Sequence, residues 1–316
     1  MKLAVVGAGA VGLSVAELAE SYGHTVTALA DSRSAAVDAD GIDVSSAIES
    51  KQREGAVGTT APETALDGTY DVLVEATPTT LGDAQPAFGH LRTALERDRH
   101  VVLANKGPVA QRYGEVRELE RESDGSVRFE ATVGGAIPVL STIEAVGTAN
   151  ITAVRGILNG TANFILSRMA AEGLAYEHAL AEAQDLGVAE TDPTFDVDGT
   201  DAALKCVILA NVLSDEQTVT LDDATVEGIE DLPVSALELA HDDGQTIRLV
   251  GSVGGDAVSV GPRLVPDHGT LAVTGTRNIV QFETTHAGLL NNSGRGAGGP
   301  ETATAIMADI GLLPDE

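Results

Sequence analysis

The feature that most constrains the fold lies at the start of the chain, where an apolar segment runs into a glycine-rich turn. Residues 2–6 (Lys-Leu-Ala-Val-Val) have the composition of a buried strand, Gly7-Ala-Gly-Ala-Val-Gly12 follows directly, and apolar residues then recur at helical spacing. In this context a G-x-G-x-x-G turn brings the backbone close to a pyrophosphate and lets the helix pack on the sheet. The segment predicts a βαβ unit that binds a dinucleotide. The expected contacts are Gly7, Gly9, Ala10, Val11 and Gly12.

The rest of the N-terminal part repeats this alternation of strands and helices. Strands are expected at 25–30, 72–75, 100–104 and 127–131, and helices at 44–53, at 83–97 and from the turn at 105–108 to about 122. Alternating elements imply parallel βαβ units, and the right-handed crossover rule then gives a doubly wound Rossmann sheet. The fold class is therefore α/β, with a dinucleotide-binding domain over residues 1–132.

After about residue 145 the rhythm changes to that of an α+β domain. Strands are expected at 150–158, 246–253, 257–265 and 278–284, and helices at 161–172, 175–186 and 200–213. This second domain is placed at residues 133–299. A last helix within 300–316 is expected to complete the first domain.

Composition excludes several classes of protein. The net charge is −29, from 48 acidic and 19 basic residues, so nucleic acids and anionic membranes would be repelled. Acid excess, with 4 lysines among those 19 basic residues, predicts adaptation to high salt, where counter-ions screen self-repulsion. The single cysteine, Cys206, rules out an intramolecular disulfide. Neither a signal peptide nor an apolar run of membrane-spanning length is visible, which predicts a cytoplasmic protein.

The end of the second expected strand bears on the choice of dinucleotide. Asp31 stands where a carboxylate accepts a hydrogen bond from the ribose 2′-hydroxyl of NAD. Arg33 follows two residues later and could instead pair with the 2′-phosphate of NADP. The sequence leaves both cofactors open.

Two lysines are the candidates for proton transfer. An oxidoreductase acting on an alcohol needs a group that takes the hydroxyl proton as hydride leaves carbon. The chain has no tyrosine-x-x-x-lysine pair, and none of its seven histidines lies in a recognisable motif. Lys106 follows the fourth strand, where a doubly wound sheet opens on its ligand. Lys205 follows Asp201 by four residues on an apolar helix, although a buried ion pair without a catalytic role is the alternative there.

Segments along nearly the whole chain resemble homoserine dehydrogenase. The first is the glycine turn, and later ones include Glu75-Ala-Thr77, Ala104-Asn-Lys106 and Glu130-Ala-Thr-Val-Gly-Gly-Ala-Ile-Pro138. The remainder are Leu158-Asn-Gly-Thr-Ala-Asn-Phe-Ile-Leu166, Ala183-Gln-Asp-Leu-Gly-Val-Ala-Glu-Thr-Asp-Pro193 with Asp196, Asp201 and Lys205, and Gly294-Arg-Gly-Ala-Gly-Gly299. This many segments in this order make the resemblance specific.

The resemblance implies an NAD(P)-dependent interconversion of L-homoserine and L-aspartate 4-semialdehyde in threonine and methionine biosynthesis. Lys205 and Lys106 would be the catalytic lysines, with Asp201 holding Lys205. The substrate, a small amino acid, would be bound by Gly160, Thr161, Glu190, Asp196, Asp201 and Lys205. The cofactor would also contact Ala76, Thr77, Asn105, Lys106 and Gly296.

The resemblance further implies a monovalent cation, Na⁺ or K⁺, at Glu130, Val133, Gly135 and Ile137, and a homodimer joined through the second domain. One departure is Val188, which stands where the family commonly has tyrosine. The chain ends soon after the last motif, so a regulatory domain is not expected.

Two other functions compete with this reading. A phosphorylating semialdehyde dehydrogenase would need a nucleophilic cysteine, and Cys206 lacks a histidine neighbour. A non-catalytic dinucleotide sensor would be expected to lose Lys106, Glu190 or Lys205, and the chain has all three.

Overall fold

The structure, a computed structural model, describes residues 1–214, 218–254 and 257–314. The chain forms two compact units. Unit 1 comprises residues 1–136 together with the segment from Ala297 onward, and unit 2 comprises Ile137–Gly296. The sequence analysis had placed these boundaries at 132/133 and 299/300. The last two residues of the expected 300–316 helix lie outside the described residues.

Unit 1 is built on a six-stranded sheet with the order β3-β2-β1-β4-β5-β6, in which all pairs are parallel except β2–β3. This order confirms the expected doubly wound sheet. The strands are β1 (Lys2–Val6), β2 (Thr25–Ala30), β3 (Ala35–Val37), β4 (Val72–Glu75), β5 (His100–Leu103) and β6 (Val127–Arg128). The helices are α1 (Ala10–Ala19), η1 (Glu20–Tyr22), α2 (Val44–Glu54), α3 (Thr64–Asp67), α4 (Ala87–Leu95), α5 (Gly107–Gln111), α6 (Tyr113–Arg121), η2 (Glu130–Thr132) and α13 (Gly299–Gly311).

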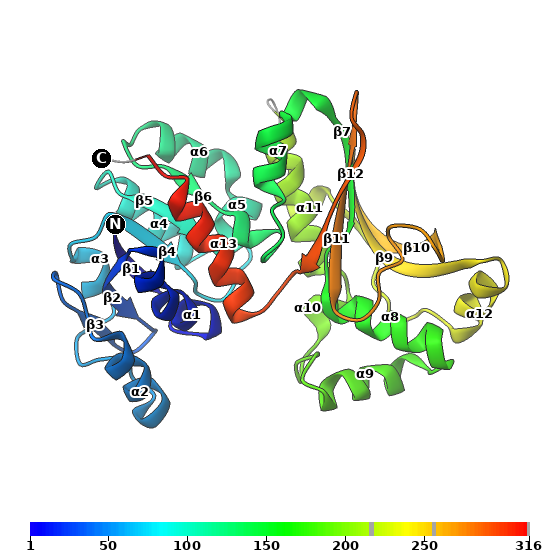
Figure 1. The fold of residues 1–316 in the computed structure, drawn as a ribbon, viewed down its shortest axis with the longest axis horizontal. Coiled ribbons are helices and arrows are strands. Elements are labelled where there is room, and N and C mark those ends of the chain that lie inside the picture. The colour runs from blue at the N-terminus through cyan, green and yellow to red at the C-terminus, as the bar shows by residue number, and fades with distance from the viewer. Residues whose placement is uncertain (215–217, 255–256, 315–316) are drawn as a thin grey trace. The chain divides into compact units, whose positions relative to one another are not determined.

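The C-terminal helix α13 packs beside α1 in unit 1 (Figure 1). Ile306, Met307 and Ile310 share one buried cluster with Val5 and Val15. Burial of such side chains stabilises the sheet by about 1.5–3 kcal/mol each. The helix that follows the last glycine motif therefore belongs to the core of the N-terminal unit.

Unit 1 differs from the sequence expectation at two places. The strand expected over 127–131 ends at Arg128, and the chain turns into η2 because Phe129 leaves the extended conformation (φ −156°, ψ 32°). The helix expected from residue 83 begins at Ala87.

Unit 2 contains a mixed sheet with the order β12-β11-β7-β9-β10-β8, antiparallel apart from β8–β10. Its strands are β7 (Ile151–Ile157), β8 (Thr225–Val226), β9 (Gln245–Gly254), β10 (Ala257–Pro266), β11 (Arg277–Thr284) and β12 (Gly288–Arg295). Its helices are α7 (Leu140–Val146), η3 (Thr148–Asn150), α8 (Gly160–Glu172), α9 (Tyr176–Asp185), α10 (Thr194–Val197), α11 (Thr200–Leu213), η4 (Leu221–Asp223) and α12 (Val234–Asp242). Strand β12 and helices α7 and α12 were not expected from the sequence.

Helix α11 is the central helix of unit 2 and packs against β7, β9 and β10. Every residue from Asp201 to Asn211 is buried. The helix is apolar around its circumference, as expected for a helix enclosed by other elements. Lys205 is thus held inside the unit. Among the described residues, no helix is both long and apolar enough to span a membrane.

Candidate active site

The three glycines of the N-terminal turn are required for different steric reasons. Gly7 has φ +108°, and a Cβ there would lie 2.4 Å from the carbonyl carbon of Ala76. A Cβ on Gly12 would lie 1.9 Å from the carbonyl oxygen of Gly7, whereas one on Gly9 would meet nothing within 4 Å. Gly9 is therefore the position at which a phosphate can approach the backbone. Ala10 and Val11 begin α1, whose N-terminus favours an anion.

Asp31 lies directly after β2 with both carboxylate oxygens engaged. Oδ1 accepts hydrogen bonds from the backbone N–H groups of Arg33 (2.7 Å) and Ser34 (2.8 Å), and Oδ2 pairs with Lys51 Nζ at 2.5 Å. Burial acts to raise the pKa of Asp31, but the bonds from Lys51 and from the backbone outweigh it and lower the pKa. The Arg33 guanidinium donates to the Gly55 carbonyl oxygen. Lys51, which the sequence analysis did not assign, thus joins Asp31 and Arg33.

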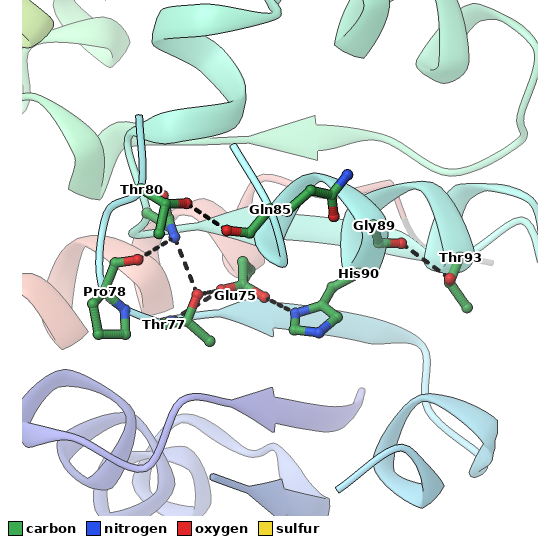
Figure 2. Close-up of polar contacts among 9 residues, drawn as sticks. Glu75, Thr77, Pro78, Thr80, Gln85, Gly89, His90 and Thr93 are labelled. Carbon is green, nitrogen blue, oxygen red and sulfur yellow. Dashed lines mark hydrogen bonds and ion pairs between the residues drawn. The ribbon is translucent and has the colours of Figure 1, made fainter. Parts of the chain in front are cut away.

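At the carboxyl ends of β4 and β5, the structure brings Thr77 and Asn105 together. Asn105 Nδ2 donates to Thr77 Oγ1 (3.1 Å) and to the Pro78 carbonyl oxygen (2.9 Å) (Figure 2). Lys106 follows as the residue before α5, and its backbone N–H donates to Thr79 Oγ1 at 3.3 Å. Ala76 lies against Gly7, so this loop and the glycine turn are neighbours.

In unit 2, Lys205 is the centre of a buried polar group. Its Nζ donates to Asp201 Oδ2 (2.7 Å) and to the Leu158 carbonyl oxygen (2.6 Å). The side chains of both residues are at most 10% exposed. The helical spacing of four residues predicted this pair.

Asn159 connects this pair to Asp196. Its Nδ2 donates to Asp196 Oδ1 (2.6 Å) and to Asp201 Oδ2 (3.0 Å), while its Oδ1 accepts from the Ala162 N–H (2.8 Å) as the N-cap of α8. Burial raises the pKa of Asp196; Asn159 acts to lower it and the nearby Asp201 charge to raise it further. Sequence reasoning missed Asn159, although it stands inside the quoted Leu158–Leu166 segment, because an asparagine before a helix reads as a cap.

The other expected substrate residues surround this polar group less directly. Gly160 and Thr161 form the first turn of α8, and Thr161 Oγ1 donates to the Val188 carbonyl oxygen (3.2 Å). Glu190 has an exposed side chain, and among the described residues no hydrogen bond joins its carboxylate to the Lys205 group. Its carboxylate is accessible to a cationic ligand.

Gly296, expected to face the cofactor, ends unit 2 beside Asn278. A Cβ on Gly296 would lie 2.0 Å from Asn278 Nδ2. The close approach of Asn278 is sufficient to require glycine here.

The expected cation residues lie around η2 and the segment after it. Glu130 is buried, and its backbone N–H donates to Oδ2 of the buried Asp309 at 2.8 Å. Val133 is buried, Gly135 has φ +55°, and Ile137 is the first residue of unit 2. Two buried carboxylates with nearby carbonyl groups fit the oxygen ligands that hard cations prefer.

Cys206 is buried next to Lys205 and does not have the properties of a nucleophile. Burial raises the pKa of its thiol to about 12. The thiolate is the reactive form, so this site does not support cysteine chemistry.

Comparisons with known proteins agree on one family. A family model described as homoserine dehydrogenase matches residues 138–310, and one described as glutamate/leucine/phenylalanine/valine dehydrogenase matches residues 1–80. A homoserine dehydrogenase of Methanocaldococcus jannaschii is 40% identical over 98% of this chain and 97% of its own. An NAD(+)-dependent homoserine dehydrogenase of Pseudomonas canavaninivorans is 40% identical over 76% of this chain and 70% of its own.

Solved structures give the same result. A crystal structure of a putative homoserine dehydrogenase from Archaeoglobus fulgidus has a TM-score of 0.91 and 40% identity, over 98% of both chains. A hyperthermophilic archaeal homoserine dehydrogenase in complex with NADPH has a TM-score of 0.84 and 27% identity, over 98% of this chain and 96% of its own.

Proposed function

The chain belongs to the homoserine dehydrogenase family, and we propose that its buried Lys205 carries out the proton transfer of this reaction. The enzyme is an NAD(P)-dependent oxidoreductase that interconverts L-homoserine and L-aspartate 4-semialdehyde. The observation that carries the proposal is the 2.7 Å bond between Lys205 and Asp201 inside a helix that is otherwise apolar. Enclosing a charged pair costs free energy, which a catalytic role would justify.

The geometry suggests how Lys205 acts. A lysine ammonium has three hydrogens, and Asp201 and the Leu158 carbonyl group each accept one. The third can be donated to the carbonyl oxygen of the semialdehyde, so that this oxygen becomes the hydroxyl group of homoserine. In the oxidation direction the neutral amine accepts the same proton. The bound nicotinamide supplies the hydride in reduction and accepts it in oxidation.

Substrate binding is proposed for residues whose chemistry matches an amino acid. The exposed carboxylate of Glu190 is suited to the substrate ammonium group. The first turn of α8, with Gly160 and Thr161, offers backbone N–H groups to a carboxylate. Asp196 is joined to the catalytic pair by Asn159 and would order the polar side of the site.

For the cofactor, we propose that Thr77, Asn105 and Lys106 lie at the nicotinamide end and that the glycine turn holds the pyrophosphate. Asp31, Arg33 and Lys51 would surround the adenosine ribose. A carboxylate paired with a lysine offers a partner to either a 2′-hydroxyl or a 2′-phosphate. Gly296 is proposed to approach the cofactor from unit 2.

A homodimer is proposed through the sheet of unit 2. The register places Arg155, Gln281, Glu283, Leu289 and Asn291 on one face of β7, β11 and β12. All except Gln281 are exposed. A broad face that alternates exposed polar and apolar side chains suits pairing with a second copy. A Na⁺ or K⁺ ion bound at Glu130, and a place in threonine and methionine biosynthesis, complete the proposal.

The decisive experiment assays purified protein, folded in molar salt, with L-homoserine and with NAD⁺ and NADP⁺ in turn. Lys205→Ala should lower kcat by about 100-fold or more, the usual scale of a lost general acid or base, while NADPH still binds. Lys2→Ala is the matched control, because Lys2 Nζ bonds only the Ala39 carbonyl oxygen among the described residues. Full turnover by Lys205→Ala would disprove the assignment.

A further inference from the structure

Unit 1 contains a fully buried carboxylate that the proposed mechanism does not use. Glu75 ends β4, and its side chain is 0% exposed. Its Oε1 accepts from the Thr77 backbone N–H (3.0 Å) and from the Thr77 hydroxyl, and its Oε2 lies 2.6 Å from His90 Nδ1 on α4 (Figure 2). A buried carboxylate is costly unless both oxygens are hydrogen-bonded, and here both are.

The carboxylate fixes the direction of a chain of hydrogen bonds. An ionised carboxylate only accepts, so the Thr77 hydroxyl must point its hydrogen at Glu75. The hydroxyl oxygen then accepts from Asn105 Nδ2 at 3.1 Å. If Glu75 instead donated a proton to Thr77, the Thr77 hydrogen would be turned toward the Asn105 amide, and donor would face donor.

Asn105 passes this orientation to the loop that carries Lys106. Its second Nδ2 hydrogen goes to the Pro78 carbonyl oxygen (2.9 Å), and its Oδ1 accepts from the Gly107 N–H (2.8 Å). The amide is thereby held at three points, with Lys106 between Asn105 and Gly107. A disturbance at Glu75 would reach both loops at this edge of the sheet.

The same loop also borders the phosphate turn. The Ala76–Thr77 backbone lies where a Cβ on Gly7 would be, at 2.4–2.6 Å. A shift of Thr77 therefore changes the support of the glycine turn as well as the position of Asn105.

We propose that the buried Glu75–His90 pair is a positioning device for the dinucleotide site, acting through Thr77 and Asn105. His90 donates from Nδ1 and keeps Glu75 charged and oriented. Both are positioning residues, because their contacts reach the site only through Thr77. The inference rests on the proposed assignment of Thr77, Asn105 and Lys106 to the cofactor.

The test compares His90→Leu with His90→Asn. Leucine and asparagine have the same branched shape, but only asparagine places an N–H donor near the former Nδ1. The dissociation constants of NADPH and NADH are read from the fluorescence of the reduced nicotinamide, which this chain without tryptophan leaves free of indole emission. His241→Leu is the control, since His241 lies 3.8 Å from Asp267 on an 82% exposed side chain.

His90→Leu should weaken dinucleotide binding by about tenfold, on the scale of a lost hydrogen bond to a charged group, and raise the KM for the dinucleotide more than it lowers kcat. His90→Asn should stay within about twofold of the parent, a rescue that a purely structural role at the same melting temperature would not show. Equal effects of the two variants, or parent-like binding by His90→Leu, would overturn the proposal.

Glu75→Gln provides a second route if His90→Leu does not fold. It keeps the volume and the acceptor toward Thr77 but loses the charge, and it should also weaken NADPH binding. Parent-like binding by folded Glu75→Gln would equally refute the device. These outcomes are separate from the proposed function, because Lys205→Ala tests turnover while leaving NADPH binding intact.

Discussion

Asn159 shows how much of this site depends on a residue without charge. One amide group donates to Asp196 and Asp201, and its oxygen caps α8. It separates two carboxylates that would otherwise repel each other next to Lys205. The geometry of the catalytic lysine therefore depends on a neutral side chain.

Asn159→Ser separates the two roles of this residue. Serine keeps the N-cap but lacks the amide donors, so stability should change little while kcat falls by about tenfold, as for a lost bond to a charged group. Burial raises the pKa of Asp196, and Asn159 acts to lower it. Without the amide that pKa rises further, so the acid limb of the kcat/KM profile should move to higher pH. An unchanged profile would refute the link.

The Asp31–Lys51 pair should appear in the acid stability of the protein. The folded pKa of Asp31 lies below its ordinary value of 3.8. Its contribution is thus complete above that value and is lost as the pH falls through the lowered folded pKa. Urea unfolding of Asp31→Asn should show a deficit that is constant at neutral pH and shrinks on acidification. The exposed Asp185→Asn is the control, and a pH-independent deficit would contradict the expectation.

At the scale of elements, the glycine turn separates folding from binding. Gly7→Ala combines a φ of +108° with a Cβ 2.4 Å from Ala76, whereas Gly9→Ala meets nothing within 4 Å. Gly7→Ala should destabilise the protein by more than ~1 kcal/mol. Gly9→Ala should melt like the parent and lose NADPH binding, because its methyl group occupies the approach of the phosphate. Thermal melts with fluorescence titrations check both, and equal melting temperatures would count against the steric argument.

Elements with a strong period could be predicted from the sequence, and elements set by tertiary contacts could not. The alternation of apolar strands and helices gave the parallel sheet of unit 1, and the spacing from Asp201 to Lys205 gave the catalytic pair. Strand β12 was missed because Asn291, Asn292, Ser293 and Gly294 have low strand propensity, and pairing with β11 decides their conformation. Lys51 was missed because its partner Asp31 lies on another element.

At the scale of the whole molecule, the open face of the unit 2 sheet predicts the assembly. Light scattering in molar salt should give twice the chain mass of 32.3 kDa. High salt matters because the net charge of −29 per chain opposes association when it is unscreened. Leu289→Arg, at a side chain 57% exposed on β12, should give monomers.

Leu239→Arg is the matched control for that experiment. Leu239 is 67% exposed, but it lies on α12 and not on the sheet. It should remain a dimer. Monomers of the parent protein, or dissociation by both substitutions, would refute pairing through this face.

The path of the chain through unit 1 has a consequence for synthesis on the ribosome. The sheet and α1 emerge first, but Ile306, Met307 and Ile310, which cover α1 in the finished protein, emerge last. All of unit 2 is made in between. The nascent N-terminal segment must therefore wait, with Val15 and its neighbours uncovered, and such exposed apolar surface is where nascent chains aggregate or recruit chaperones. The order of translation makes the nucleotide-binding unit the first to begin folding and the last to be completed.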